Sequence, residues 1–190
     1  MTPTNQPPTL KEPTNQPCPE PISCDCSPIR TEQPPNPAPT VDRDRLQLLA
    51  KDLTREYPRS PRESLAGYVI AGRTLDKCRA SLNGTLGEYK FDCTLDRQFF
   101  SFAGIEANQF RDLVATGASD AEVAEWIQEH AQPRPRLEII KWNHRMRELR
   151  ISELPDANQE FLEEYIRQFV PRHRPVYCWF DVYDLEEERL

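Results

Sequence analysis

The chain has 190 residues, a formal net charge of −7 and 37% apolar residues, which suits one domain of ordinary size rather than two. The sequence does not open with a basic segment followed by an apolar run, so it predicts no secretory signal. Its longest apolar runs fall far short of the roughly 20 residues that a membrane-spanning helix needs. We therefore expect a cytoplasmic protein without a membrane role, whose six cysteines are reduced thiols.

The first 40 residues differ in composition from the rest. They hold 12 of the 19 prolines and no aromatic residue. Because such a segment buries too little apolar surface to offset the entropy of ordering, we expect residues 1–40 to be a disordered, Pro-rich tail before a single domain over 41–190. Cys18, Cys24 and Cys26 lie in this tail without a nearby histidine, so they do not predict a metal site.

Two helices are predicted at the start of the domain. Leucines at helical spacing predict the first over about 42–56. Ser60-Pro61-Arg62-Glu63 combines a capping serine, a proline at the first helical position and a glutamate that can return a hydrogen bond. This signal predicts a long second helix that runs toward Leu82 and ends at Asn83-Gly84.

The remaining pattern is also mainly helical. Further helices are predicted to end at Gly104 and Gly117, and the capping box Ser119-Asp120-Ala121-Glu122 predicts the start of another. Residues 87–91 favour a short extended piece, and 176–180 suit a strand or a helical turn. Periodic segments also cover 139–149 and 161–169. The fold class is therefore mainly α, a compact multi-helix bundle with at most one or two short strands.

The predicted second helix carries charges where apolar residues are expected. On a wheel of about 100° per residue, Asp76 and Arg79 fall on the stripe of Leu65 and Val69. A buried carboxylate is costly without a partner. Asp76 and Arg79 either pair with each other or with backbone of the next loop, or line a pocket that holds an anionic group. The candidate ligand-binding residues are Arg73, Asp76, Lys77, Arg79, Glu88, Tyr89 and Asp96.

These charges lie within a longer motif. It includes Gly67-Tyr68-Val69-Ile70, Arg73-Thr74-Leu75-Asp76-Lys77-Cys78-Arg79-Ala80, Gly84, Gly87-Glu88-Tyr89, Cys93-Thr94-Leu95-Asp96, Phe99, Gly104, Gly117-Ala118-Ser119-Asp120, Trp126, Trp142-Asn143 and Trp179-Phe180-Asp181. Over about residues 50–185 the chain resembles a bacterial family of domains of unknown function, number 5069 in its series. The resemblance implies no activity, because that family has no assigned reaction. Thr94 replaces a frequent proline of the family, and Ala71-Gly72 replace an apolar residue and a proline.

A basic segment over 134–150 raises the possibility of nucleic-acid binding. It contains six basic and two acidic residues. However, Trp142 shares an apolar face with Ile139 and Met146, which favours a core position, and the chain as a whole is acidic. Nucleic acid is therefore the weakest of three interpretations. We expect the acidic C-terminus to be a solubilising segment or to pack against this basic helix.

The leading interpretation is a binding or adaptor module. It would hold a protein partner or a small anionic ligand near the loop between the predicted second and third helices. The alternative is a small enzyme without a cofactor that uses the cluster of Arg73, Asp76, Lys77, Arg79, Glu88 and Tyr89. Cysteines and histidines are available for nucleophilic catalysis, but none has a recognisable catalytic neighbourhood. The sequence thus assigns no catalytic residue, cofactor or metal.

Overall fold

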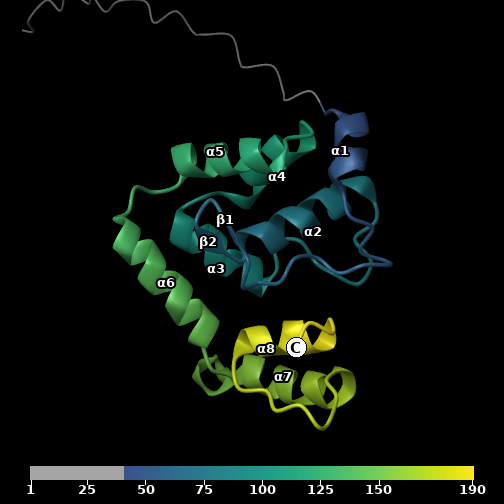
Figure 1. The fold of residues 1–190 in the computed structure, drawn as a ribbon, viewed down its shortest axis with the longest axis vertical. Helices are drawn as coiled ribbons and strands as arrows, with labels where there is room; N and C mark the ends of the chain where they lie inside the picture. Colours follow the sequence, from purple (N-terminus) through teal and green to yellow (C-terminus); the bar gives the residue numbers. More distant parts are fainter. Residues whose placement is uncertain (1–40) are drawn as a thin grey trace, which may run out of the picture. The chain divides into compact units, whose positions relative to one another are not determined.

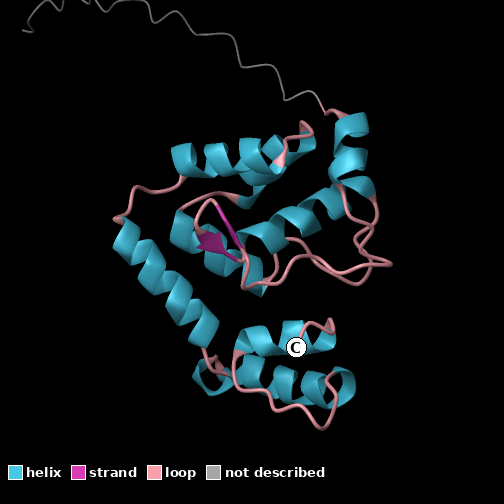
Figure 2. Ribbon diagram, viewed as in Figure 1, coloured by secondary structure: helices cyan, strands magenta, loops and turns pink. Residues whose placement is uncertain are grey.

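The computed structural model describes residues 41–190, so the expected tail, with Cys18, Cys24 and Cys26, lies outside the described residues. The described chain is mainly α, as predicted (Figure 1). Figure 2 shows its helices in cyan and its single small hairpin in magenta. The elements are α1 (Arg43–Leu49), β1 (Ser64–Leu65), β2 (Tyr68–Val69), α2 (Ala71–Asn83), α3 (Thr94–Ala103), α4 (Ala107–Ala115), α5 (Asp120–His130), α6 (Arg136–Glu148), the 3-10 turn η1 (Ile151–Glu153), α7 (Asp156–Phe169) and α8 (Trp179–Glu186).

The predicted start of the second helix is wrong. Ser60 and Glu63 make local hydrogen bonds, because the Arg62 N–H donates to Ser60 Oγ and the Ser60 N–H donates to Glu63 Oε1, both at 3.2 Å. These bonds stabilise a turn, and the chain then forms the β1–β2 hairpin instead of a helix. Ala66 and Gly67 at its tip both have positive φ, 52° and 88°, which is the pattern of a type I′ turn. Helix α2 therefore begins only at Ala71.

Other boundaries agree better with the sequence pattern. Gly104 ends α3 in the left-handed conformation, and the capping box of Ser119 and Glu122 opens α5 as predicted. The first helix is shorter than expected. It ends at Leu49, whereas the sequence pattern predicts a helix over about 42–56. Residues 87–91 form turns and irregular backbone rather than a strand. The ambiguous segment over 176–180 contains an isolated bridge from Cys178 to Arg150 and then the start of α8.

Helix α2 is the most buried element of the described chain. Each residue from Ala71 to Ala80 is buried, and α2 packs against α1, α3, α4 and β1. Trp142 lies in the core, as predicted, where its ring stacks on Phe102 with centroids 4.5 Å apart. Within residues 41–190, every helix is too short or too polar to cross a membrane. Because residues Ala71 to Ala80 of α2 are all buried, the charged residues of this helix lie inside the protein.

Candidate functional site

Four charged side chains of α2 lie in the interior. Arg73, Asp76, Lys77 and Arg79 are each only 2–3% exposed. Removing a charge from water costs several kcal/mol unless an opposite charge and hydrogen bonds replace the water. Each of the four has such a partner, and each partner comes from a different part of the chain.

Asp76 and Arg79 are linked through Arg59 and Asp120. Arg59 Nη2 donates to Asp76 Oδ1 at 2.7 Å, and its Nη1 donates to Asp120 Oδ2 at 2.6 Å. Arg79 Nη1 donates to the other oxygen of Asp120 at 2.6 Å, and its Nη2 donates to the Ala118 carbonyl. Burial opposes ionisation of Asp120, but the two arginines outweigh it and lower its pKa. These bonds tie the segment before β1 and the start of α5 to α2.

Arg73 and Glu187 form the most deeply buried ion pair. The guanidinium donates to both carboxylate oxygens, at 2.9 Å and 2.6 Å, in a bidentate arrangement. Tyr89 Oη donates to Glu187 Oε1 at 2.9 Å, and Arg189 also donates to Glu187. Burial favours the neutral form of Glu187, but the hydrogen bonds and charges of Arg73 and Arg189 outweigh it and lower its pKa. The C-terminal segment is thereby anchored to α2.

The third buried pair joins α2 to α3. Lys77 Nζ lies 2.8 Å from Asp96 Oδ1, which also accepts a hydrogen bond from Thr74 Oγ1 at 2.9 Å. Lys77 donates further to the Lys90 carbonyl at 3.1 Å. The second oxygen of Asp96 accepts the Cys93 N–H at the start of α3. Asp96 thus neutralises a buried lysine and fixes the beginning of a helix.

Sequence reasoning missed several members of this ion-pair network. Arg59 and Arg62 flank the Ser60-Pro61 pair, whose helix-start signal gives no indication that these arginines bond carboxylates far away in the sequence. The acidic C-terminus was expected to be solubilising or to pack against the basic helix. Helix α8 does contact the basic helix α6. Its acidic residues bond elsewhere, however, because Asp181 and Asp184 pair with Arg62. Glu187 pairs with Arg73.

Six of the seven predicted site residues therefore lie in or beside the network, but not in the arrangement expected. The bond between Asp76 and Arg79 is not formed, because Arg59 and Asp120 take their place as partners. The α2 cations expected to hold an anionic ligand each have a carboxylate partner already. Glu88 stands apart, exposed and without a hydrogen bond or ion pair to any residue of 41–190. Nor do residues 41–190 contain a group of three or more His, Cys, Asp or Glu arranged to hold a metal ion.

A groove of about 780 Å³ lies beside the loop that joins α2 to α3. Glu88 and Tyr89 line it, whereas the other predicted site residues do not. We call it the tyrosine groove, after its lining residues Tyr57, Tyr89 and Tyr165, which are accompanied by Glu56, Glu88 and Glu186. Arg55 is the one basic residue among its lining residues. The groove is therefore aromatic and acidic.

Two of the groove's tyrosines are held in place by hydrogen bonds. Tyr165 Oη donates to Glu186 Oε1 at 2.6 Å, and Tyr89 Oη donates to Glu187. Burial raises the pKa of both tyrosines and of Glu186. Two of its rings already face cations of the chain, with Arg73 5.5 Å from the centroid of Tyr89 and Arg189 5.9 Å from that of Tyr57. Such rings attract positive charge through their π faces.

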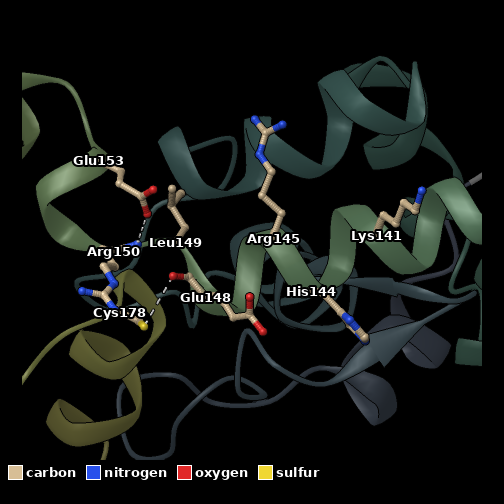
Figure 3. Close-up of a pocket in the computed structure, with 8 residues that line it drawn as sticks. All are labelled: Lys141, His144, Arg145, Glu148, Leu149, Arg150, Glu153 and Cys178. Atoms are coloured by element: carbon tan, nitrogen blue, oxygen red, sulfur yellow. Dashed lines mark hydrogen bonds between the residues drawn. The ribbon is translucent and has the colours of Figure 1, made fainter.

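The basic helix predicted over 134–150 presents a different surface. Lys141 and Arg145 extend from one side of α6, whereas His144 and Glu148 point the other way (Figure 3). The two cations line a depression of about 710 Å³ that also contains Glu148 and Glu153. Neither Lys141 nor Arg145 makes a side-chain hydrogen bond or ion pair within the described residues. Trp142 is turned into the core, so it is not placed to stack on a nucleic-acid base.

Comparison with known proteins identifies the family but not an activity. A search of curated proteins finds no significant match to the chain. The family described as Domain of unknown function (DUF5069) matches residues 55–189, a region that includes α2, most of the ion-pair network and α8. The chain therefore belongs to this family of domains of unknown function.

Proposed function

We propose that the protein is a binding module whose tyrosine groove receives a positively charged side chain, lysine or arginine, of a protein partner. The observation that carries the proposal is the lining of the groove. The lining contains three tyrosines and three glutamates but only one arginine, next to the loop between α2 and α3. Aromatic rings and carboxylates together are the groups that recognise guanidinium and ammonium ions.

The charge of the ligand follows from the pairing of the buried cations. A small anion near this loop would need a free arginine or lysine. Arg73 and Lys77 are bonded to Glu187 and Asp96, and both are almost fully buried. The exposed charges beside the loop, by contrast, include Glu56 and Glu88. A cationic partner therefore fits this place better than the anionic ligand expected from the sequence.

Two of the three tyrosines of the groove are held in place before any partner arrives. Tyr89 is bonded to Glu187, which the bidentate pair with Arg73 fixes to α2. Tyr165 is bonded to Glu186 on α8. Side chains that are already ordered lose less entropy on binding. The bonds of Tyr89 and Tyr165 therefore reduce the entropy that the groove loses when it binds a partner.

The enzyme interpretation has less support. Among the described cysteines, Cys78 is buried, and burial raises its pKa to about 12, the direction opposite to that of an activated thiol. The charged cluster that was the candidate active site consists largely of ion pairs inside the protein. Buried pairs of this kind are common structural elements.

Binding of a labelled hexa-arginine peptide to the full chain tests the proposal. We expect the double change Glu88→Gln and Glu186→Gln to weaken binding by about tenfold or more, because it removes two groove charges. The amide introduced by Glu186→Gln keeps an oxygen that can accept a hydrogen bond from the Tyr165 hydroxyl. The matched control, Glu125→Gln with Glu129→Gln, removes two exposed charges of α5. Equal weakening by both pairs, or no binding by the wild type, would contradict the proposal.

A further inference from the structure

A cleft without charged walls lies where the start of α3 meets α7 and α8. Its volume is about 390 Å³, within the size range of pockets that hold ligands. Among the described residues that line it, none is an aspartate, glutamate, lysine, arginine or histidine. Thr94 and Asn158 supply uncharged polar groups. We call it the apolar cleft, after its lining residues Leu95, Phe161, Leu162, Trp179 and Tyr183.

The apolar cleft adjoins the tyrosine groove. Phe161 lines the cleft and Tyr165 lines the groove, and their ring centroids are 5.6 Å apart. Inside the protein, the guanidinium of Arg73 lies 4.8 Å from the ring centroid of Tyr183, in the cleft, and 5.5 Å from that of Tyr89, in the groove. Aromatic contacts therefore connect the two sites, and one segment of a partner can reach both.

The distance between cleft and groove determines which side chains of such a segment fit. Phe161 and Tyr165 are four residues apart on α7, which corresponds to a rise of about 6 Å along the helix. In an extended segment, side chains two residues apart point to the same side and lie about 6.5 Å apart. Side chains one or three residues apart point to opposite sides. An extended segment therefore matches the two sites with side chains two residues apart.

We propose that the apolar cleft receives a large aliphatic side chain, such as leucine, that lies two residues from the lysine or arginine in the tyrosine groove. Both side chains belong to one extended segment of the protein partner. The inference rests on the proposed function and adds a second recognised residue to it. Uncharged walls favour an aliphatic side chain over a second cation, because a buried charge is costly without a carboxylate partner. The glutamates of the groove supply that partner for the first cation.

Titration of the isotope-labelled full chain with short peptides, followed by NMR, tests the inference. Each peptide contains one arginine and one leucine in a glycine-serine background, with the leucine one, two or three residues before or after the arginine. At a spacing of two, in one of the two chain directions, we expect binding about tenfold tighter than that of the same peptide with alanine in place of leucine. Spacings of one and three are expected to gain much less, because the leucine then points away from the cleft.

Two phenylalanines of α7 provide a matched pair of variants. Phe161 and Phe169 are 63% and 52% exposed, so both can be replaced without opening the core. Both rings contact Tyr165, with centroids 5.6 Å and 4.6 Å away, but only Phe161 lines the apolar cleft. We expect Phe161→Ala to reduce the gain from leucine to about threefold or less. Phe169→Ala is expected to keep the gain.

Replacing the arginine of the peptide by glutamine separates the two proposals. We expect this replacement to weaken binding, and unchanged binding would contradict the proposed function together with the inference that rests on it. A leucine that adds nothing at any spacing, or adds the same at every spacing, would overturn the inference alone. An equal loss of the gain in Phe161→Ala and Phe169→Ala would also overturn it. Binding of hexa-arginine is unaffected by these last outcomes, so the proposed function would remain.

Discussion

Helices α2 and α6 carry similar charges in the sequence, but these charges have different surroundings in the two helices. Each contains several basic residues on a partly apolar helix. On α2, every charged side chain is buried and bonded to a partner from another part of the chain. On α6, Lys141 and Arg145 are exposed and unpaired within the described residues. Charge along a helix therefore does not distinguish buried charges of the framework from free charges of the surface, but the position of its carboxylate partners does.

The partners of α2 show what its charges accomplish. Asp120 begins α5, Asp96 lies in the first turn of α3, and Glu187 follows α8. An ion pair with a specific geometry forms only when both elements are correctly placed. We interpret the network as a set of links that position these elements around one helix. The exposed Lys141 and Arg145 of α6 have no such constraint within the described residues.

The largest expected effect is that of Arg73→Met. The change leaves Glu187, whose side chain has no exposed surface, with only Arg189 as a cationic partner. Breaking a buried ion pair on one side costs about 3–5 kcal/mol. We expect a loss of that size in the free energy of unfolding, measured in urea. Arg73→Met with Glu187→Met should lose less, and an equal or larger loss would contradict the assignment.

The same pair should make this loss depend on pH. Arg73 and Arg189 hold the pKa of Glu187 below its ordinary value of 4.5. A carboxyl with a lowered pKa in the folded state stabilises the protein above its ordinary pKa, and the contribution is lost as the pH falls through the lowered value. Without Arg73, only Arg189 opposes the effect of burial, so protonation of Glu187 becomes more favourable than in the wild type. The stability difference between wild type and Arg73→Met should therefore shrink below about pH 4.5. A difference that is constant between pH 7 and pH 3 would contradict this link.

A smaller loss is expected for Asp76→Asn. Arg59 loses one of its two carboxylate partners but keeps Asp120, and its side chain is 21% exposed. Hydrogen bonds to charged groups are worth about 1.5–3 kcal/mol, so we expect a loss within that range in thermal or urea unfolding. Wild-type stability in this variant would show that Asp76 is free for a ligand rather than part of the framework.

The sequence predicted the local features of this protein better than its remote ones. The helix ends at Gly104 and Gly117 and the capping box at Ser119 depend on neighbouring residues, and the corresponding predictions agree with the structure. The hairpin at Ala66-Gly67 was missed, because a strong helix-start signal at Ser60 precedes it and only the tertiary packing of Tyr68 and Val69 decides between the two.

The candidate site shows the same division. The position of Asp76 on the helical wheel is enough to predict that this residue is buried and has a partner. The identity of that partner depends on Arg59, 17 residues away, and that of Arg73 on Glu187, 114 residues away. Periodicity contains no information on such pairs. Asp76 and Arg79 lie close together on one helix, which makes them the obvious pair, yet each bonds to a partner farther away in the sequence.

The smallest effect, and the sharpest test of the contrast, is expected for Lys141→Ala and Arg145→Ala. Both side chains are exposed and make no bond within residues 41–190, so each change should alter the free energy of unfolding by no more than about 0.5 kcal/mol. A loss comparable to that of Asp76→Asn would mean that α6 holds its charges as α2 does. A neutral result would separate the two helices, because the charges of α2 then serve the fold and Lys141 and Arg145 do not.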